Sequence, residues 1–190
     1  MAKEQKGNVW SIAGGAPLQS MLERADSPPL LCQVLSAALP WQTRNETSLA
    51  RALASPRLAP QWTATLLALG AVVRIRADDG LADMPLEAWL ERRPAGAVVA
   101  LRIPHGSPDR RWGRAHVGRT PADEPIVAAV AVVELRGDAV QQARVALTGV
   151  WPEAARLAQA GARLVGGPLD EARIREVGAA VEAEATPPED

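Results

Sequence analysis

The chain has 190 residues, of which 47% are hydrophobic and 23% charged, as in an ordinary soluble globular protein. Its 21 Lys and Arg against 22 Asp and Glu give a net charge of −1, which argues against nucleic-acid binding and against a polybasic membrane-binding surface. A single cysteine, Cys32, excludes an intrachain disulfide framework, so we expect a reducing, cytoplasmic location.

Neither the start of the chain nor its longest uncharged stretch has the pattern of a targeting or membrane segment. Residues 1–6 carry three charges and lead into no apolar stretch of the kind that a secretory signal needs. Residues 27–43 are uncharged, but three prolines interrupt them. We therefore expect no secretory signal and no membrane span.

The apolar spacing predicts short helices and strands in the first part of the chain. Glycine and proline set most of the expected ends. The expected elements are a strand at 9–12, helices at 18–24 and 30–39, a polar turn-like segment at 41–59, a helix at 62–69, a strand at 71–76, a short helix at 84–90 and a strand at 97–103.

The second part of the chain predicts a hairpin followed by helices. The expected elements are a loop at 104–119, strands at 126–135 and 140–148, helices at 152–160 and 169–184 and a frayed tail at 186–190. The predicted fold class is α+β. A mixed α/β part over residues 1–104 would precede a C-terminal antiparallel sheet with helices on one face over residues 105–190.

Several segments occur in a familiar order. In residues 146–170, a strand ends at Gly149, Pro152 opens a predicted helix that carries Arg156, and a Leu-x-Gly closes it at Leu164. This order resembles the C-terminal domain of the flavoprotein subunit of the molybdenum hydroxylases, the xanthine dehydrogenase and carbon monoxide dehydrogenase family. Upstream, a segment similar to the family's Gly-Arg-Arg and Asp pattern is formed by Gly118, Arg119 and Asp123.

Two earlier segments extend the resemblance. Residues 11–22 look like the family's strand-to-helix segment, and residues 44–71 look like its flavin-binding loop and the helix that follows. The resemblance implies a partial FAD-binding-like domain over residues 1–104 and a flavoprotein C-terminal-like domain over residues 105–190. It also implies a truncated relative, because the family subunit begins with a separate subdomain that carries a second pyrophosphate-binding loop.

The flavin loop departs from the family pattern, which runs Arg-Asn-x-x-Thr-Ile-Gly-Gly-Asn. Here the segment that begins at Arg44 and Asn45 places Ser48, Leu49, Ala50, Arg51 and Ala52 opposite the last five family positions. Paired glycines let backbone N–H groups approach a diphosphate, so side chains in their place should close that cradle. The same register puts Gln61 where the family has a cofactor-binding Asp, and His116 where it has a Lys near the flavin ring.

These departures favour a non-catalytic or cofactor-less structural subunit that keeps the packing scaffold of the family. Its expected partner is a larger molybdenum or iron-sulfur subunit, a complete flavin subunit, or a second copy of itself. The alternative is a FAD-binding electron-transfer subunit that another chain completes. In that case the cofactor-binding residues would be Arg44, Asn45, Ser48, Arg51 and His116. A small-ligand sensor that reuses the cleft is a third possibility.

The other candidate site residues could have structural roles instead of chemical ones. Asn45 and Ser48 could cap the helix that follows them instead of contacting phosphate. Neither His105 and His116 nor any Ser or Cys stands in a recognisable metal-binding or nucleophile motif, and Cys32 fits a core position. The remaining feature is an arginine cluster around Trp112, which could meet an anionic ligand or an acidic partner or could be solvated: Arg110, Arg111, Arg114 and Arg119.

Overall fold

The computed structural model describes residues 9–78, 80–120 and 125–187. The chain forms two compact units, one from residues 1–55 and 70–105 and the other from residues 56–69 and 106–190. The first unit therefore ends next to the boundary expected at residue 104, but a separate segment, 56–69, packs with the second unit. The division into two flavoprotein-like domains stays a prediction. Asp123 and the last three residues of the expected tail lie outside the described residues.

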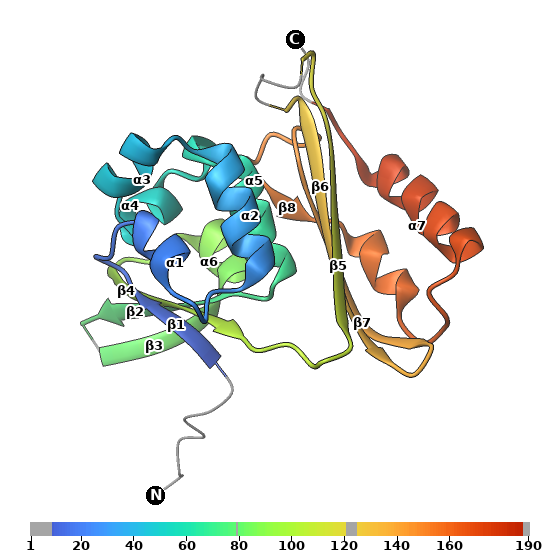
Figure 1. Ribbon diagram of the computed structural model, residues 1–190, viewed down its shortest axis with the longest axis horizontal. Coiled ribbons are helices and arrows are strands. Elements are labelled where there is room, and N and C mark those ends of the chain that lie inside the picture. The colour runs from blue at the N-terminus through green and yellow to red at the C-terminus, as the bar shows by residue number, and fades with distance from the viewer. Residues whose placement is uncertain (1–8, 79, 121–124, 188–190) are drawn as a thin grey trace, which may run out of the picture. The chain divides into compact units, whose positions relative to one another are not determined.

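The first unit is a four-stranded antiparallel sheet with small helices, and its strand order is β1-β4-β2-β3 (Figure 1). Alternating burial in the first strand turns Trp10 and Ile12 into the core. The elements are β1 (Val9–Ala13), α1 (Gln19–Glu23), α2 (Pro29–Ala38), α3 (Trp41–Glu46), α4 (Leu49–Ala54), β2 (Val72–Ala77), β3 (Gly80–Pro85), α6 (Leu86–Arg92) and β4 (Ala97–Pro104).

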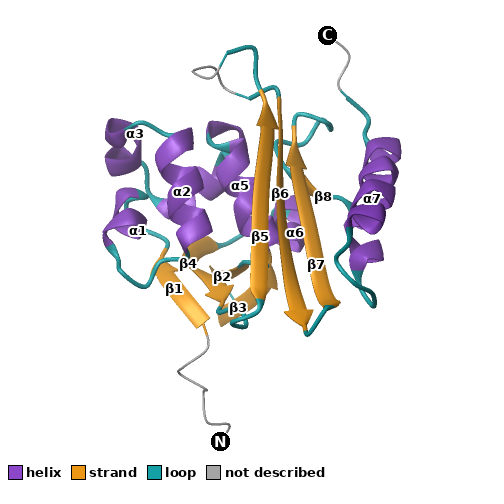
Figure 2. Cartoon of the chain, turned by 45° about the vertical axis from the view of Figure 1, so that its right-hand side comes forward, coloured by secondary structure: helices purple, strands orange, loops and turns teal. Residues whose placement is uncertain are grey.

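The second unit is an antiparallel sheet of order β5-β6-β7-β8, and Figure 2 shows its long strands beside one another. Helix α7, the helix expected at 169–184, packs together with the 3-10 helix η2 on one face of this sheet, and helix α5 covers the other face. The elements are η1 (Pro56–Leu58), α5 (Pro60–Ala68), β5 (Arg110–Val117), β6 (Val127–Arg136), β7 (Ala139–Thr148), β8 (Arg156–Leu157), η2 (Gln159–Leu164) and α7 (Glu171–Glu184).

Helix α5 and helix α7 differ in how much of their surface is buried. Helix α5 begins with Pro60, whose missing N–H costs nothing at that position, and seven of its nine residues are buried. Helix α7 buries Val177 and is otherwise largely exposed. Among the residues that the structure describes, no helix is long and apolar enough to span a bilayer.

Gly149 explains why a glycine follows the long hairpin. Its φ of 77° lies in the left-handed region, and a β-carbon there would collide with the backbone oxygen of Ile126. The glycine therefore lets strand β7 turn away at the point where it lies closest to the start of β6.

Three predicted segments were wrong. Residues 41–59 are not turn-like: they form α3, α4 and η1, with Pro40 and Ser48 at the helix starts. The expected loop at 104–119 contains strand β5, which pairs with β6 along its whole length. The expected helix at 152–160 is instead the short strand β8 and the start of η2, because residues 156 and 157 pair with β7.

The helix expected at 84–90 also starts later. Residues 80–85 form strand β3, which closes a hairpin with β2, and helix α6 begins at Leu86. The other expected elements are present with small shifts in their ends. The predicted α+β class, with antiparallel sheets and helices, is confirmed.

An ion-pair network ties three strands of the first unit together. The Asp83 carboxylate on β3 accepts hydrogen bonds from Arg74 on β2, at 2.7 and 2.9 Å, and from Arg102 on β4, at 2.7 Å. The bonds from Arg74, followed by those from Arg102, hold the pKa of Asp83 below its ordinary value, although burial acts in the opposite direction.

We therefore expect Asp83→Asn to destabilise the protein at pH 7. The loss should be about 0.5–1 kcal/mol, because solvent screens side chains that are about a third exposed. A carboxyl whose pKa is lowered by folding stabilises the fold above its unfolded pKa, near 4, and that contribution disappears as the pH falls through the folded pKa. The difference in urea unfolding free energy between variant and parent should thus shrink between pH 5 and pH 3. Asp78→Asn, in the same hairpin, is the matched control, and an equal loss there would contradict the prediction.

Candidate functional site

Arg44, the first residue of the flavin-loop resemblance, holds helices together. Its Nε donates to the Gln19 side chain of α1 at 2.9 Å, and its Nη1 donates to the backbone oxygens of Ser36 and Leu39 at the end of α2. A guanidinium satisfies carbonyl groups at a helix C-terminus well, because they carry partial negative charge. The local geometry gives Arg44 a structural role.

Asn45 and Ser48 also bond within the chain. The Asn45 amide donates to the Trp41 carbonyl at 2.8 Å, one turn back in α3. Ser48 is the N-cap of α4, where its hydroxyl accepts the N–H of Arg51 at 3.3 Å. The capping alternative for Ser48 is therefore what the structure contains, whereas Asn45 belongs to the preceding helix.

Backbone hydrogen bonds join residues 47–50 to the segment that follows β1. The Leu49 N–H donates to Ala16 O at 2.9 Å, and the Ala50 N–H donates to Gly14 O at 2.8 Å. In the opposite direction, the Leu18 N–H donates to Thr47 O at 3.0 Å. Gly14 must be a glycine here, since a β-carbon would collide with the Val98 backbone of β4.

The N–H groups that a diphosphate cradle would use are consequently occupied. Those of Leu49 and Ala50 bond to the segment after β1, and those of Arg51 and Ala52 bond to the side chain and the backbone oxygen of Ser48. Ala52, opposite the family's Asn, is buried, whereas the Arg51 side chain is exposed. The residues of this loop do not fit the glycine-lined cradle of a dinucleotide. The sequence showed that both glycines are missing, but it could not show that acceptors on Gly14, Ala16 and Ser48 bind the N–H groups of the loop.

The remaining predicted cofactor residue, His116, lies on β5 of the second unit, opposite Ala128 of β6, and is exposed. Arg44, Asn45, Ser48 and Arg51 belong to the first unit, where the structure brings them together on two consecutive helices. The structure therefore unites four of the five predicted residues in one local motif.

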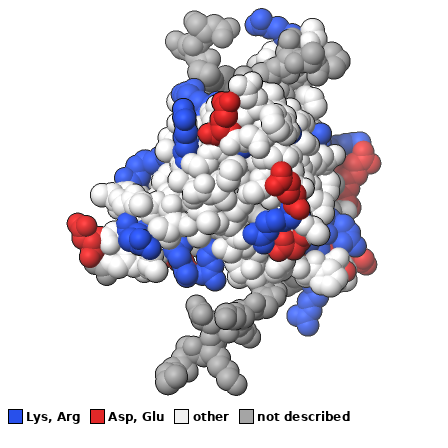
Figure 3. Space-filling model, turned by 60° about the vertical axis from the view of Figure 1, so that its left-hand side comes forward, with Lys and Arg blue, Asp and Glu red and all other residues white. Residues whose placement is uncertain are grey.

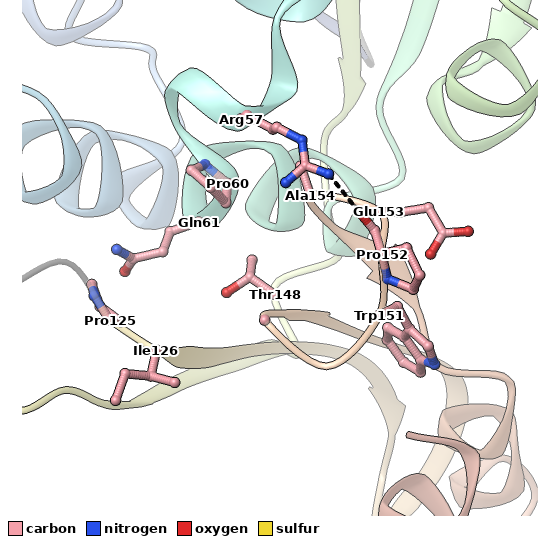
Figure 4. Close-up of a pocket in the computed structure, with 11 residues that line it drawn as sticks. Arg57, Pro60, Gln61, Pro125, Ile126, Thr148, Trp151, Pro152, Glu153 and Ala154 are labelled. Atoms are coloured by element: carbon pink, nitrogen blue, oxygen red, sulfur yellow. Dashed lines mark hydrogen bonds between the residues drawn. The ribbon is translucent and has the colours of Figure 1, made fainter. Parts of the chain in front are cut away.

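Gln61 is in the second unit as well, and it lines a cavity of about 400 Å³. Figure 4 shows Gln61 and Thr148 directed toward this cavity from α5 and the end of β7. Arg57 stands at its edge and donates to the Pro152 carbonyl at 2.9 Å. The lining combines apolar prolines, a tryptophan and charges of both signs: Arg57, Pro60, Gln61, Pro125, Ile126, Thr148, Gly149, Trp151, Pro152, Glu153 and Ala154.

The arginine cluster lies mostly on strand β5. Arg110 pairs with Glu134 of β6 at 2.5 Å, and Ser107 also donates to that carboxylate. Burial alone would raise the pKa of Glu134, but the hydrogen bonds from Ser107 and Arg110 outweigh it, so the pKa is lowered. Arg111 and Arg114 form no ion pair with a carboxylate among the residues that the structure describes.

No metal-binding or nucleophilic group stands out within the described residues. No three His, Cys, Asp or Glu side chains gather there as a metal site would require. Cys32 is half-buried rather than fully in the core, and burial raises the pKa of its thiol, which disfavours the reactive thiolate at neutral pH. Figure 3 shows a largely uncharged face on which basic and acidic side chains are interspersed.

Comparison with known proteins gives one family match and several structures of similar fold. Residues 115–190 match the family described as the CO dehydrogenase flavoprotein C-terminal domain. A carbon monoxide dehydrogenase from Hydrogenophaga pseudoflava that lacks the Mo-pyranopterin moiety of the molybdenum cofactor shares the fold, with a TM-score of 0.84 and 21% identity over 98% of this chain and 68% of that chain. A search of curated proteins found no match.

Two further solved structures agree. Reconstituted CO dehydrogenase from Oligotropha carboxidovorans has a TM-score of 0.77 and 19% identity over 97% of this chain and 68% of its own. Quinoline 2-oxidoreductase from Pseudomonas putida 86 has a TM-score of 0.79 and 23% identity, with coverages of 98% and 68%. The resemblance to the FAD-binding subunit of the molybdenum hydroxylases is thus confirmed, by sequence over residues 115–190 and by fold over nearly the whole chain.

The structural role of Ser48 leads to a stability prediction. Ser48→Ala removes the acceptor for the Arg51 N–H and should lower the free energy of unfolding by about 1 kcal/mol, whereas Ser48→Asp should restore the cap. Urea denaturation followed by circular dichroism measures both. If Ser48→Ala were as stable as the parent, the hydroxyl would have no capping role.

Proposed function

We propose that this chain is a non-catalytic interaction subunit related to the flavoprotein subunit of the molybdenum hydroxylases, and that it holds no FAD at the loop of residues 44–52. The observation that carries the proposal is the occupation of the loop's N–H groups by Gly14, Ala16 and Ser48. A diphosphate would have to displace these bonds, and leaving buried backbone groups unpaired costs about 1–3 kcal/mol each.

Three further features support this proposal. The loop lacks both glycines of the family pattern, Gln61 replaces the family's Asp carboxylate, and His116 replaces its Lys. The scaffold is nevertheless retained, as the TM-score of 0.84 indicates. A chain that keeps the packing of a subunit but not its cofactor contacts is suited to binding another subunit. We expect that partner to be a molybdenum or iron-sulfur subunit in the cytoplasm, which is consistent with the single cysteine.

A FAD-binding electron-transfer subunit completed by another chain is the second candidate, and the same fold match favours it. In that case Arg44, Asn45, Ser48, Arg51 and His116 would contact the cofactor, and FAD would supply the electron-transfer chemistry. The two candidates differ in one measurable property, which is the affinity of the loop for FAD.

We expect no FAD to be released on denaturation, either from the purified full chain or from the complex that it forms with a molybdenum or iron-sulfur subunit in its source cells, where a site completed by another chain would be filled. Arg51→Ala should change neither result, because the Arg51 side chain is exposed and contributes to no cradle. Stoichiometric FAD, with weaker binding in Arg51→Ala, would instead establish the second candidate.

The partner is tested separately. A tagged full chain isolated from its source cells should bring down a molybdenum or iron-sulfur subunit, identified by mass spectrometry. Recovery of the chain as a monomer, under conditions that keep such complexes intact, would contradict the interaction role even if FAD were absent.

A further inference from the structure

Strand β5 forms an open edge of the second unit's sheet. It is eight residues long and pairs with β6 from Arg110 to Val117, and the order β5-β6-β7-β8 places no strand from the described residues on its other side. Backbone N–H and C=O groups along such an edge can accept an additional strand. The opposite edge, β8, has only two residues, so β5 is the long edge of this unit.

The side chains of β5 are exposed on both faces of the sheet. All residues of β5 after Arg110 are exposed, and the exposed fraction is 44% for Trp112 and 66% for Val117. Charged residues on an edge strand often prevent unwanted pairing, but an exposed tryptophan in the middle of the strand acts against that protection. The composition therefore suits a strand that is covered by a partner.

The two faces of β5 have different chemistry because side chains alternate. One face presents Trp112, Arg114 and His116, of which Arg114 has no carboxylate partner among the described residues. The other face presents the small residues Gly113 and Ala115 between Arg111 and Val117, which lie at the two ends of the strand. In the part of the chain that the structure describes, no atom beyond the two neighbouring residues lies within 4 Å of where a Gly113 β-carbon would be, so packing there does not require a glycine. A glycine inside a strand often marks the close approach of another backbone.

We propose that β5 is the docking edge for an extended segment of a partner subunit in which acidic and apolar residues alternate. The proposal rests on the interaction role argued above and names its surface. Acidic side chains of the added strand would meet Arg114 beside Trp112, and apolar side chains would cover Gly113 and Ala115 on the opposite face.

The charges favour this occupant over two others. A second copy of β5 would bring Arg111 and Arg114 of each chain near those of the other, and like charges on paired strands repel. A single-stranded nucleic acid could stack on Trp112, but the net charge of −1 gives no long-range attraction for phosphates.

The test uses an eight-residue synthetic peptide of alternating Val and Glu, with a peptide of alternating Val and Lys as its counterpart. Titrated into the ¹⁵N-labelled full chain, the Glu peptide should shift the amide resonances of β5, slow their hydrogen exchange and bind more weakly as salt is raised. Arg114→Glu should weaken binding at least about ten-fold, and Trp112→Ala should do the same. Arg136→Glu, an exposed residue at the end of β6, makes the same charge change away from the edge and should have little effect.

The proposal is overturned if the Glu peptide does not bind, if the Lys peptide binds equally, or if Arg136→Glu weakens binding as much as Arg114→Glu. Preferential binding of single-stranded DNA, or dimerisation through β5, would overturn it as well. A co-purifying molybdenum or iron-sulfur subunit that stays bound to Arg114→Glu would reject this edge and leave the interaction role intact. Stoichiometric FAD would reject the proposed function whatever the peptide does.

Discussion

The backbone hydrogen bonds between the segment after β1 and residues 47–50 are the constraint on which the binding properties of this loop depend. Gly14 is at their centre: its N–H donates to Val99 O of β4 at 2.8 Å, and its carbonyl accepts the Ala50 N–H. A backbone N–H has one hydrogen, so a bond made within the chain cannot also be directed at a phosphate. The hydrogen bonds that fix this part of the fold thus also decide what the loop can bind.

Retention of the fold is compatible with the proposed absence of a flavin site, because the fold and such a site depend on different groups. The fold requires close backbone approaches, which Gly14 and Gly149 permit, and continuous apolar strands such as β6. A flavin site requires unoccupied hydrogen-bond donors and fixed charges. A few residues outside the core are enough to supply them. Ala50 and Arg51, which stand where the family pattern has paired glycines, are therefore compatible with the packing even though they offer a phosphate a different surface.

Sequence patterns predicted the elements that bury one regular face, such as α2 and the β6–β7 hairpin, because burial imposes a period on the residues. They failed where an apolar period does not decide the structure. Residues 41–46 and 49–54 form short helices that begin after Pro40 and Ser48, whereas Arg156 belongs to a strand because β7 lies beside it. The roles of Arg44 and Ser48 depend on acceptors and donors whose positions only the folded chain fixes, so the family resemblance alone named the residues without their local function.

Strand β5 is a further element that the sequence pattern could not predict. Its residues are exposed on both faces, so neither alternation nor an apolar run marks it, and pairing with β6 alone makes it a strand. An edge strand whose faces are both open buries little within its own chain, and it gains stability when a further strand covers it. The absence of a strand pattern in residues 110–117 and the open edge in the structure therefore have one cause: among the described residues, this strand joins its sheet through β6 alone.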